Sequence, residues 1–242
     1  MALHFLSDDA TAADVGDEVE LTGAEAHHAA QVRRLRTGER VSVGDGRGVW
    51  LDGETVSVTP RQVVVRVSAR TRTPAPAERV VLVQALAKGD RDELAVQAAT
   101  ELGVDEIVPW QAERSVSRWD GKVDKGLARW RTIVREAAKQ AHRAWIPEVT
   151  PPVGLPELAG RAGGGRMLVL DPRADARLSD LQWGAGGDIV LVVGPEGGIS
   201  DGELDALVAA GAHRVRLGDT VLRTSTAGAA ALSVVSVRLG RW

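Results

Sequence analysis

The sequence lacks several residue types, and each absence excludes a class of chemistry. None of the 242 residues is cysteine, which excludes disulfide bonds, thiolate metal sites and cysteine nucleophiles. The five histidines show no H-E-x-x-H or similar spacing, so we expect no metal. No apolar run approaches the roughly 20 residues of a membrane span, and the N-terminal residues lack a basic-then-apolar signal pattern. We therefore expect a cytoplasmic protein without membrane attachment.

Aromatic residues are scarce, and the charges are unevenly distributed. Tyrosine is absent and phenylalanine occurs once, so any stacking on bases must use tryptophan, histidine or arginine planes. The net charge of −3 argues against indiscriminate nucleic-acid binding. Residues 111–145 nevertheless carry nine Lys or Arg against four acidic residues, largely within a stretch of helical spacing at 124–142. The basic face of the expected helix at 124–142 is either simply solvated or a track for a nucleic-acid backbone.

Turn signals divide the chain into two predicted domains, 1–72 and 79–242, joined by the proline-spaced segment T-R-T-P-A-P-A-E. The first contains a helical stretch at 25–35 and short β-branched runs at 40–44, 49–51, 54–58 and 62–67. Turn signals such as Asp45-Gly46 and Asp52-Gly53 separate these runs. The spacing predicts a small β-barrel.

The second domain alternates strands and helices, which predicts an α/β fold. Strands are expected at 80–86, 106–109, 167–170, 189–193 and 214–217, and a loop at 147–156. Helices are expected at 91–102 with Leu94 on the apolar face, at 124–142, after the capping-box pair Ser200 and Glu203 with Val208 on the apolar face, and at 226–237.

Glycine-rich loops follow two neighbouring strands of this domain. The run I-V-L-V-V ends at Gly194-Pro195 and continues as E-G-G-I-S, while the next strand ends at Gly218. In open α/β sheets, ligands bind in the crevice at the carboxyl ends of the strands. Any single glycine has a plain explanation as a turn residue, but their clustering at adjacent strand ends favours a ligand loop.

The segments G-P-E-G-G-I-S and L-G-x-x-V-L-R-T-x-T-A resemble the C-terminal signature of the RsmE family. These are 16S ribosomal RNA (uracil-N3)-methyltransferases of the SPOUT class, acting on uracil 1498. The resemblance implies a PUA-like RNA-binding domain, then an α/β domain whose trefoil knot binds S-adenosylmethionine, and a homodimer joined partly by helix 227–239. Q-A-L-A-K-G, E-L-G, E-R-S and E-A-A-K-Q-A-H-R also resemble family segments.

In the first domain, His28, Val32 and Arg34 match the family's H-x-x-x-V-L-R motif, with Arg33 at the leucine position. The arginine that the family usually carries near its N-terminus is absent from M-A-L-H-F. A cluster that includes Arg34 and Arg36 either binds phosphates or is a solvated helix end. The resemblance implies an RNA-binding set of His28, Arg34, Arg36, Lys88, Arg114, Arg135, Lys139 and Arg143.

The same resemblance implies the cofactor and catalytic residues. The cofactor set is Leu170, Gly194, Pro195, Glu196, Gly197, Gly198, Leu217, Gly218, Leu222, Arg223, Thr224 and Thr226. The N3-H proton of uracil must leave, which requires a base or a positive charge that stabilises the anion. Arg223 is the first candidate for that charge, followed by Arg114 and Lys88. Ser225 stands where the family commonly has glutamate, which leaves Glu196 or Glu101 as alternative bases.

Two other functions fit the same residues. A knotted methyltransferase could act on a different RNA, for instance a transfer RNA. Alternatively, a non-catalytic RNA-binding or ribosome-assembly factor could retain the pocket, an interpretation that Ser225 keeps open. The complete absence of asparagine disfavours ribose methylation, because related 2'-hydroxyl methyltransferases usually carry asparagine in paired motifs. A dinucleotide-binding dehydrogenase is disfavoured because no G-x-G-x-x-G follows a strand.

Overall fold

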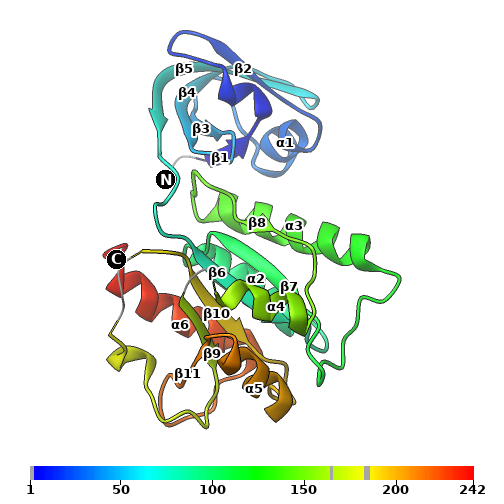
Figure 1. Ribbon diagram of the computed structural model, residues 1–242. Coiled ribbons are helices and arrows are strands. Elements are labelled where there is room, and N and C mark those ends of the chain that lie inside the picture. Colours follow the sequence, from blue (N-terminus) through cyan, green and yellow to red (C-terminus); the bar gives the residue numbers. More distant parts are fainter. Residues whose placement is uncertain (1–2, 164–165, 183–185) are drawn as a thin grey trace. The chain divides into compact units, whose positions relative to one another are not determined.

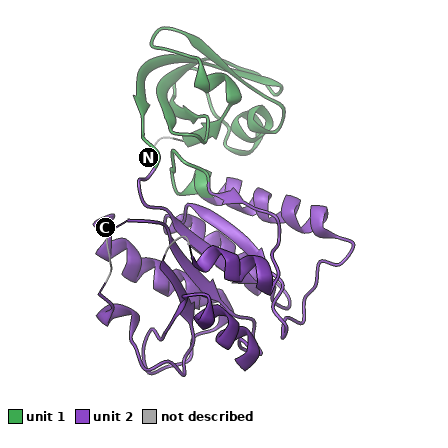
Figure 2. Ribbon diagram, viewed as in Figure 1, with its two compact units in different colours: residues 1–75, 138–146 green, residues 76–137, 147–242 purple. Residues whose placement is uncertain are grey.

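The chain folds into two compact units, which Figure 2 shows in separate colours. The computed structural model describes residues 3–163, 166–182 and 186–242. The first unit contains residues 1–75 together with 138–146, and the second contains 76–137 and 147–242. Each unit has its own hydrophobic core. Among the described residues, no helix is long and apolar enough to cross a membrane.

The first unit is built on a five-stranded sheet in the order β1-β3-β4-β5-β2. Its strands are β1 (Leu3–Leu6), β2 (Glu18–Thr22), β3 (Arg40–Gly44), β4 (Val49–Val58) and β5 (Gln62–Arg72). The β1–β3 pair is parallel and the other pairs are antiparallel. One core, which includes Phe5, Leu51 and Val63, fills this barrel-like unit. Helix α1 (Gly23–His27) continues into a π-helical turn (His28–Val32), which confirms the helical stretch predicted from the sequence.

The turn predicted at Asp52-Gly53 is wrong, because β4 runs through it without reversing. The pairing of β4 with β5 shifts register between these two residues, which marks a β-bulge. A Cβ on residue 53 would lie 2.5 Å from the carbonyl oxygen of Arg66 and 2.6 Å from Cγ1 of Val65. Glycine is therefore required here by the close approach of two strands and not by a chain reversal.

Residues 138–146 belong to the first unit although they lie far along the chain. The backbone N–H of Gly48 donates to the carbonyl of Ala144 at 2.9 Å, and that of Ile146 donates to Gly46 at 3.0 Å. The buried Lys139 forms an ion pair with Glu25 at 3.0 Å. These contacts attach the segment to the barrel-like sheet and to the edge of α1.

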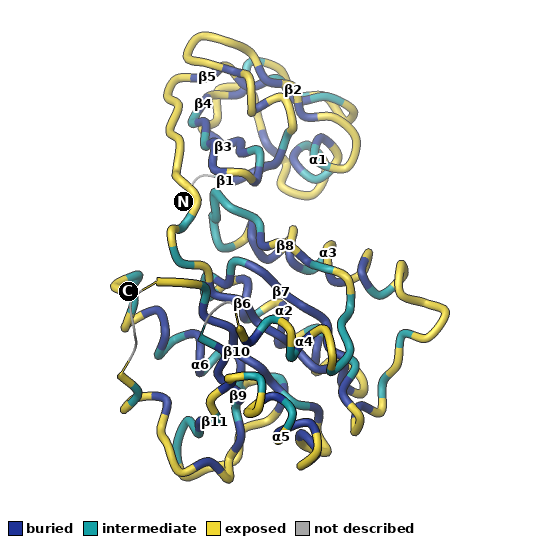
Figure 3. The backbone as a smooth tube through the Cα atoms, in the orientation of Figure 1, coloured by how far each residue is buried: buried dark blue, intermediate teal, exposed yellow. Residues whose placement is uncertain are grey.

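The second unit is a six-stranded parallel sheet in the order β11-β9-β10-β6-β7-β8 (Figure 1). The strands are β6 (Val80–Ala85), β7 (Glu106–Trp110), β8 (Glu148–Val149), β9 (Arg166–Leu170), β10 (Ile189–Val193) and β11 (His213–Val215). Strands β6, β7 and β10 are buried along their whole length (Figure 3), as the sequence predicts for β6 and β10. Because all strands are parallel, their carboxyl ends meet at one edge.

Helices cover both faces of this sheet (Figure 1). Helices α2 (Arg91–Glu101) and α6 (Thr224–Arg238) pack against each other on one face, whereas α4 (Leu155–Ala162) and α5 (Asp201–Ala209) share the other. Helix α3 (Val123–Gln140) follows β7 in the chain. The capping box at Ser200 and Glu203 is confirmed. The loop predicted at 147–156 is wrong in part, because it contains β8 and the start of α4.

Two predicted core positions are wrong. Leu94 is 49% exposed and Val208 is 46% exposed. The face that α2 buries is made instead of smaller side chains, among them Ala95 and Ala99, which allow α6 to approach closely. Helix α6 returns from edge strand β11 to pack on the central strands β10 and β6. The trefoil knot implied by the resemblance stays a prediction.

Candidate functional site

A cavity of about 670 Å³ opens at the carboxyl edge of the parallel sheet. Its walls are the segments that follow β9, β10 and β11, namely residues 170–173, 193–199, 215–218 and 220–224. Arg91, Arg114 and Ala227 complete the lining. The cavity therefore lies at the sheet edge where the glycine loops predict a ligand site. The described residues contain no cluster of three or more His, Cys, Asp or Glu that could hold a metal ion.

The glycine loop at 194–198 forms one wall of this cavity. A Cβ on residue 194 would lie 2.6 Å from Cγ1 of Ile199, so only glycine allows the chain to turn back so tightly. The backbone N–H of Gly198 donates to the carbonyl of Pro195 at 2.9 Å. The Arg114 guanidinium donates to the Gly197 carbonyl at 3.2 Å. The loop thus presents backbone, with little side-chain bulk, to a ligand.

Glu196 ties the glycine loop to the segment that follows β6. Its Oε1 accepts from the backbone N–H of Lys88 at 2.9 Å and from the Arg91 guanidinium at 3.0 Å. Burial raises the pKa of Glu196, but hydrogen bonds from its own backbone, from Lys88 and from Arg91 outweigh burial and hold the pKa below its ordinary value. The carboxylate is therefore ionised near neutral pH and holds the loop in place.

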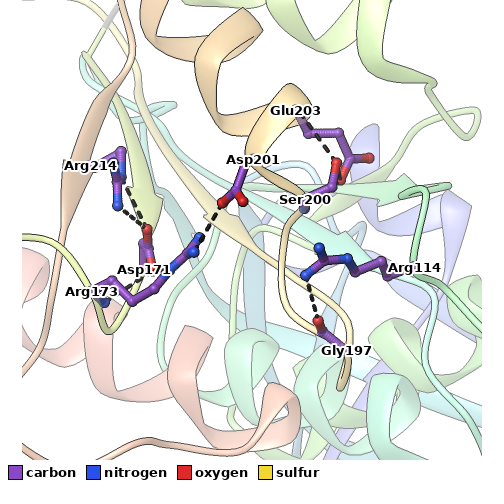
Figure 4. Close-up of polar contacts among 8 residues, drawn as sticks. All are labelled: Arg114, Asp171, Arg173, Gly197, Ser200, Asp201, Glu203 and Arg214. Carbon is purple, nitrogen blue, oxygen red and sulfur yellow. Dashed lines mark hydrogen bonds and ion pairs between the residues drawn. The ribbon is translucent and has the colours of Figure 1, made fainter.

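Asp171 organises the wall opposite the glycine loop (Figure 4). Only 5% exposed, it accepts from Arg214 through Oδ2, at 3.0 and 2.6 Å, and from the backbone and side chain of Arg173 through Oδ1. Arg173 also donates to Asp201, the first residue of α5, at 2.9 Å. Burial raises the pKa of Asp171, but these hydrogen bonds outweigh burial and lower it. Asp171 thus connects Arg214 of β11, through Arg173, to Asp201 at the start of α5.

The loop that carries Arg114 is attached to the start of α5 through Glu113; Figure 4 shows Arg114 and the capping residues Ser200 and Glu203. The Ser200 hydroxyl lies 2.7 Å from Oε2 of Glu113 and 3.0 Å from Oε2 of Glu203. The backbone N–H of Glu113 donates to Oε1 of Glu203 at 2.7 Å. The capping residues of α5 therefore also position Arg114 beside the glycine loop.

All of the predicted cofactor residues line the cavity except Thr226, whose hydroxyl donates to the carbonyl of Arg223. The sequence prediction missed Asp171 and Arg173, although Asp171 directly follows a predicted strand at the ligand edge of the sheet. A carboxylate at that position was the available signal.

Of the three catalytic candidates, Arg114 and Arg223 line the cavity and Lys88 does not. Arg223 is the N-cap residue of α6, and its guanidinium has no hydrogen-bond partner among the described residues. The other lining arginines, Arg91, Arg173 and Arg216, each form an ion pair with a carboxylate. Ser225 and Glu101 are outside the cavity lining. Arg114 and Arg223 are therefore the two lining arginines without a carboxylate partner among the described residues.

The residues expected to bind RNA divide between the units. His28, Arg34, Arg36, Lys139 and Arg143 belong to the first, and Lys88, Arg114 and Arg135 to the second. Arg34 and Arg36 are exposed, and His28 is half-buried with its ring edge against Phe5. Lys139 is only 8% exposed and paired with Glu25, so its ammonium group faces away from solvent.

Comparison with known proteins identifies the family. An RNA methyltransferase domain family matches residues 73–236, and an RNA methyltransferase PUA domain family matches residues 21–68. Ribosomal RNA small subunit methyltransferase E of Mycobacterium bovis is 46% identical over 248 residues, covering 100% of this chain and 94% of that protein. The chain belongs to the ribosomal RNA small subunit methyltransferase E family. The resemblance drawn from the glycine-loop signature is thereby confirmed.

Other members of the methyltransferase E family agree in sequence and fold. The Bacillus subtilis member is 30% identical, covering 89% of this chain and 88% of that protein. The Neisseria gonorrhoeae member, solved bound to S-adenosyl methionine, superimposes with a TM-score of 0.88 at 28% identity and covers 98% of both chains. A Legionella pneumophila methyltransferase solved with bound cofactor SAM matches with a TM-score of 0.88, 30% identity and the same coverage. The fold class, a SPOUT-type α/β domain preceded by a PUA-like domain, is confirmed.

Proposed function

We propose that the chain transfers a methyl group from S-adenosylmethionine to N3 of uracil 1498 in 16S ribosomal RNA, the target that the family resemblance implies. The observation that carries the proposal is the cavity in which the glycine loop lies beside Arg114 and Arg223. Two similar proteins, from Neisseria gonorrhoeae and Legionella pneumophila, were solved with S-adenosylmethionine bound, which supports the same cofactor here.

The residues of the cavity fit this cofactor. A volume of about 670 Å³ lies within the roughly 300–1,000 Å³ of small-molecule sites. Val193, Val215 and Leu217 supply apolar surface for an adenine ring. Backbone groups of residues 194–198 can bond the polar edges of adenine and ribose because glycines leave them accessible.

S-adenosylmethionine, when bound, would supply a methyl group on a positively charged sulfur; in-line displacement by N3 of uracil would form the nitrogen–carbon bond and leave the sulfur as a neutral thioether. Loss of the N3 proton leaves negative charge on the uracil ring. We assign Arg223 to stabilise that charge, with Arg114 beside it, because a fixed cation in a sheltered cavity favours an anion as it develops. Lys88, outside the lining, is assigned to the RNA backbone.

Neither carboxylate in the described lining is suited to be the base. Asp171 and Glu196 both have a lowered pKa, and both are engaged by arginine. Ser225, where the family commonly has glutamate, is outside the lining. We therefore infer that the N3 proton leaves to water and that the site works mainly by positioning and electrostatic stabilisation.

We also propose a homodimer in which α6 contributes to the interface. The half-buried Ala230, Ser233 and Val234 and the 62% exposed Val237 fall on one stripe of this helix at helical spacing. Small side chains on such a stripe allow a second helix to approach. Light scattering on the purified chain measures the mass, and Val237→Arg is expected to shift it from dimer towards monomer. A monomeric mass for the unaltered chain would exclude the dimer.

The deciding experiment is a methyl-transfer assay with labelled S-adenosylmethionine. Small ribosomal subunits and transfer RNA are taken from a strain that lacks the protein. We expect 3-methyluridine in the small-subunit RNA by nucleoside mass spectrometry, and a primer-extension stop at position 1498, because a methyl group on N3 blocks base pairing. Methylation of the transfer RNA alone would establish the alternative substrate. Cofactor binding without methylation of any RNA would establish the non-catalytic binding factor.

A further inference from the structure

A buried glutamine lies at the junction of three chain segments behind the cavity. Gln84, in β6, is 0% exposed, and it is the one residue of the buried strand β6 with a polar side chain. The parallel register places it beside Val193, the last residue of β10 before the glycine loop. Helix α6 packs on these same two strands (Figure 1). A buried amide costs free energy unless its hydrogen bonds are made, so its partners are informative.

Gln84 makes its two hydrogen bonds as a donor, through the side-chain nitrogen, while its Oε1 is buried without a partner among the described residues. Its Nε2 donates to the carbonyl of Ala85 at 3.1 Å and to the hydroxyl of Thr224 at 2.9 Å. Since a carbonyl only accepts, the Ala85 contact determines which end of the amide is nitrogen. The Thr224 hydroxyl therefore accepts from the amide, and its own proton goes to the carbonyl of Gly194 at 2.8 Å.

This chain of bonds joins parts of the cavity that are distant in sequence. Gly194 begins the glycine loop, and Thr224 is the first residue of α6, directly after Arg223. Gly194, Arg223 and Thr224 all line the cavity, whereas Gln84 does not. Gln84 therefore acts on the cavity from behind, by holding the Gly194 carbonyl and the first turn of α6 in one arrangement.

We propose that Gln84 is a positioning residue of the methyl-transfer site: through the Thr224 hydroxyl it sets the direction of the Gly194 carbonyl and the place of Arg223. The role of this cavity in holding S-adenosylmethionine rests on the proposed function. The effect of Gln84 on the orientation of the glycine loop and α6 does not rest on the proposed function, so this positioning role and cofactor binding can be tested separately.

The test uses the full chain and three variants. Gln84→Met keeps the length of the side chain and removes its donors, Thr224→Val removes the hydroxyl, and Thr224→Ser retains it. We expect Gln84→Met and Thr224→Val each to raise the calorimetric Kd for S-adenosylmethionine about tenfold, and Thr224→Ser to stay near the original value. The double variant Gln84→Met/Thr224→Val should bind no more weakly than Thr224→Val, because both residues act through one chain.

Hydrogen exchange without cofactor provides the second measurement. Amides of Gly194, of residues 196–198 and of the first turn of α6 are expected to exchange faster in Gln84→Met and Thr224→Val. Thr100→Val is the matched control, since it removes another buried hydroxyl, which donates to Val96 within α2 outside the cavity lining. This control should leave both the Kd and the exchange of these amides unchanged.

The outcomes separate the two proposals. Failure of the original chain to bind S-adenosylmethionine would overturn the proposed function, while exchange would still decide the role of Gln84. Normal binding by the original chain, with Kd and exchange in Gln84→Met equal to those of Thr100→Val, would reduce Gln84 to an ordinary core residue. Strictly additive effects in the double variant would show that Gln84 does not act through Thr224.

Discussion

His4 makes the stability of the first unit dependent on pH. Its ring is 7% exposed, stacks on Trp50 with 4.0 Å between centroids, and has Nδ1 3.0 Å from the Ser42 hydroxyl. Burial is the main reason that the pKa of His4 falls to about 4 from the ordinary 6.5. The neighbouring His142 and Lys139 lower this pKa further, and Glu25 raises it.

The direction of the effect follows from proton binding. Between pH 6.5 and about 4, the unfolded chain carries a proton on this histidine and the folded chain does not. Acidification through that window therefore favours unfolding, and the full stability is present only above pH 6.5. At about 1.4 kcal/mol per pKa unit, the loss attributable to His4 reaches about 3 kcal/mol near pH 4.

Native-state hydrogen exchange of the β1 and β3 amides, corrected for the intrinsic rate at each pH, measures this loss. The comparison is between the original chain, His4→Gln, and the control His213→Gln, which alters an exposed histidine of the second unit. His4→Gln should be less stable at pH 7, because it loses the stacking on Trp50, yet it should lose about 3 kcal/mol less on acidification to pH 4. Parallel pH curves for the original chain and His4→Gln would refute the reasoning.

Three further predictions concern the cavity. Gly197→Val should raise the calorimetric Kd for S-adenosylmethionine at least about tenfold, because a Cβ on residue 197 would lie 3.2 Å from Cβ of Arg114. Gly202→Ala is the control and should leave this Kd unchanged, since no atom lies within 4 Å of the added Cβ. Arg223→Ala should lower the turnover number about a hundredfold with little change in cofactor Kd, and Arg223→Lys should recover part of the lost turnover. Equal losses in turnover and in cofactor affinity would instead make Arg223 a residue that binds the cofactor. Glu196→Gln should raise the cofactor Kd about threefold or more by weakening the contact to Arg91, which an unchanged Kd would contradict.

The regular elements of the second unit follow largely from local sequence. Strand β10 is a continuous apolar run and β6 is apolar except for Gln84, and α5 begins at the capping pair Ser200 and Glu203. The errors are at positions where tertiary contacts decide. Leu94 is exposed because α2 buries a different face, which includes Ala95 and Ala99, and no local pattern reveals which face of a helix its neighbours will cover.

Glycine illustrates the same limit. The glycines at 194 and 53 both look like turn residues in the sequence, and only the folded chain distinguishes them. Gly194 allows a tight loop at a strand end, whereas Gly53 lies in the middle of β4, where a Cβ would meet the backbone of Arg66 on β5. The neighbour that requires glycine in β4 is a residue of another strand, and periodicity carries no information about it.

The sequence alone determined the alternation of strand and helix, the ligand edge of the sheet, the glycine loop and the family. Those features depend on residues adjacent in the chain, whose spacing is visible without coordinates. The tertiary structure decided which charges are free: it pairs Asp171 with Arg214 and Arg173, ties Glu196 to Arg91, and leaves the Arg223 guanidinium without a partner among the described residues. It also joined Gln84 to Thr224, residues separated by 140 positions. Electrostatics and buried hydrogen bonds depend on distance in space, and only the folded chain sets that distance.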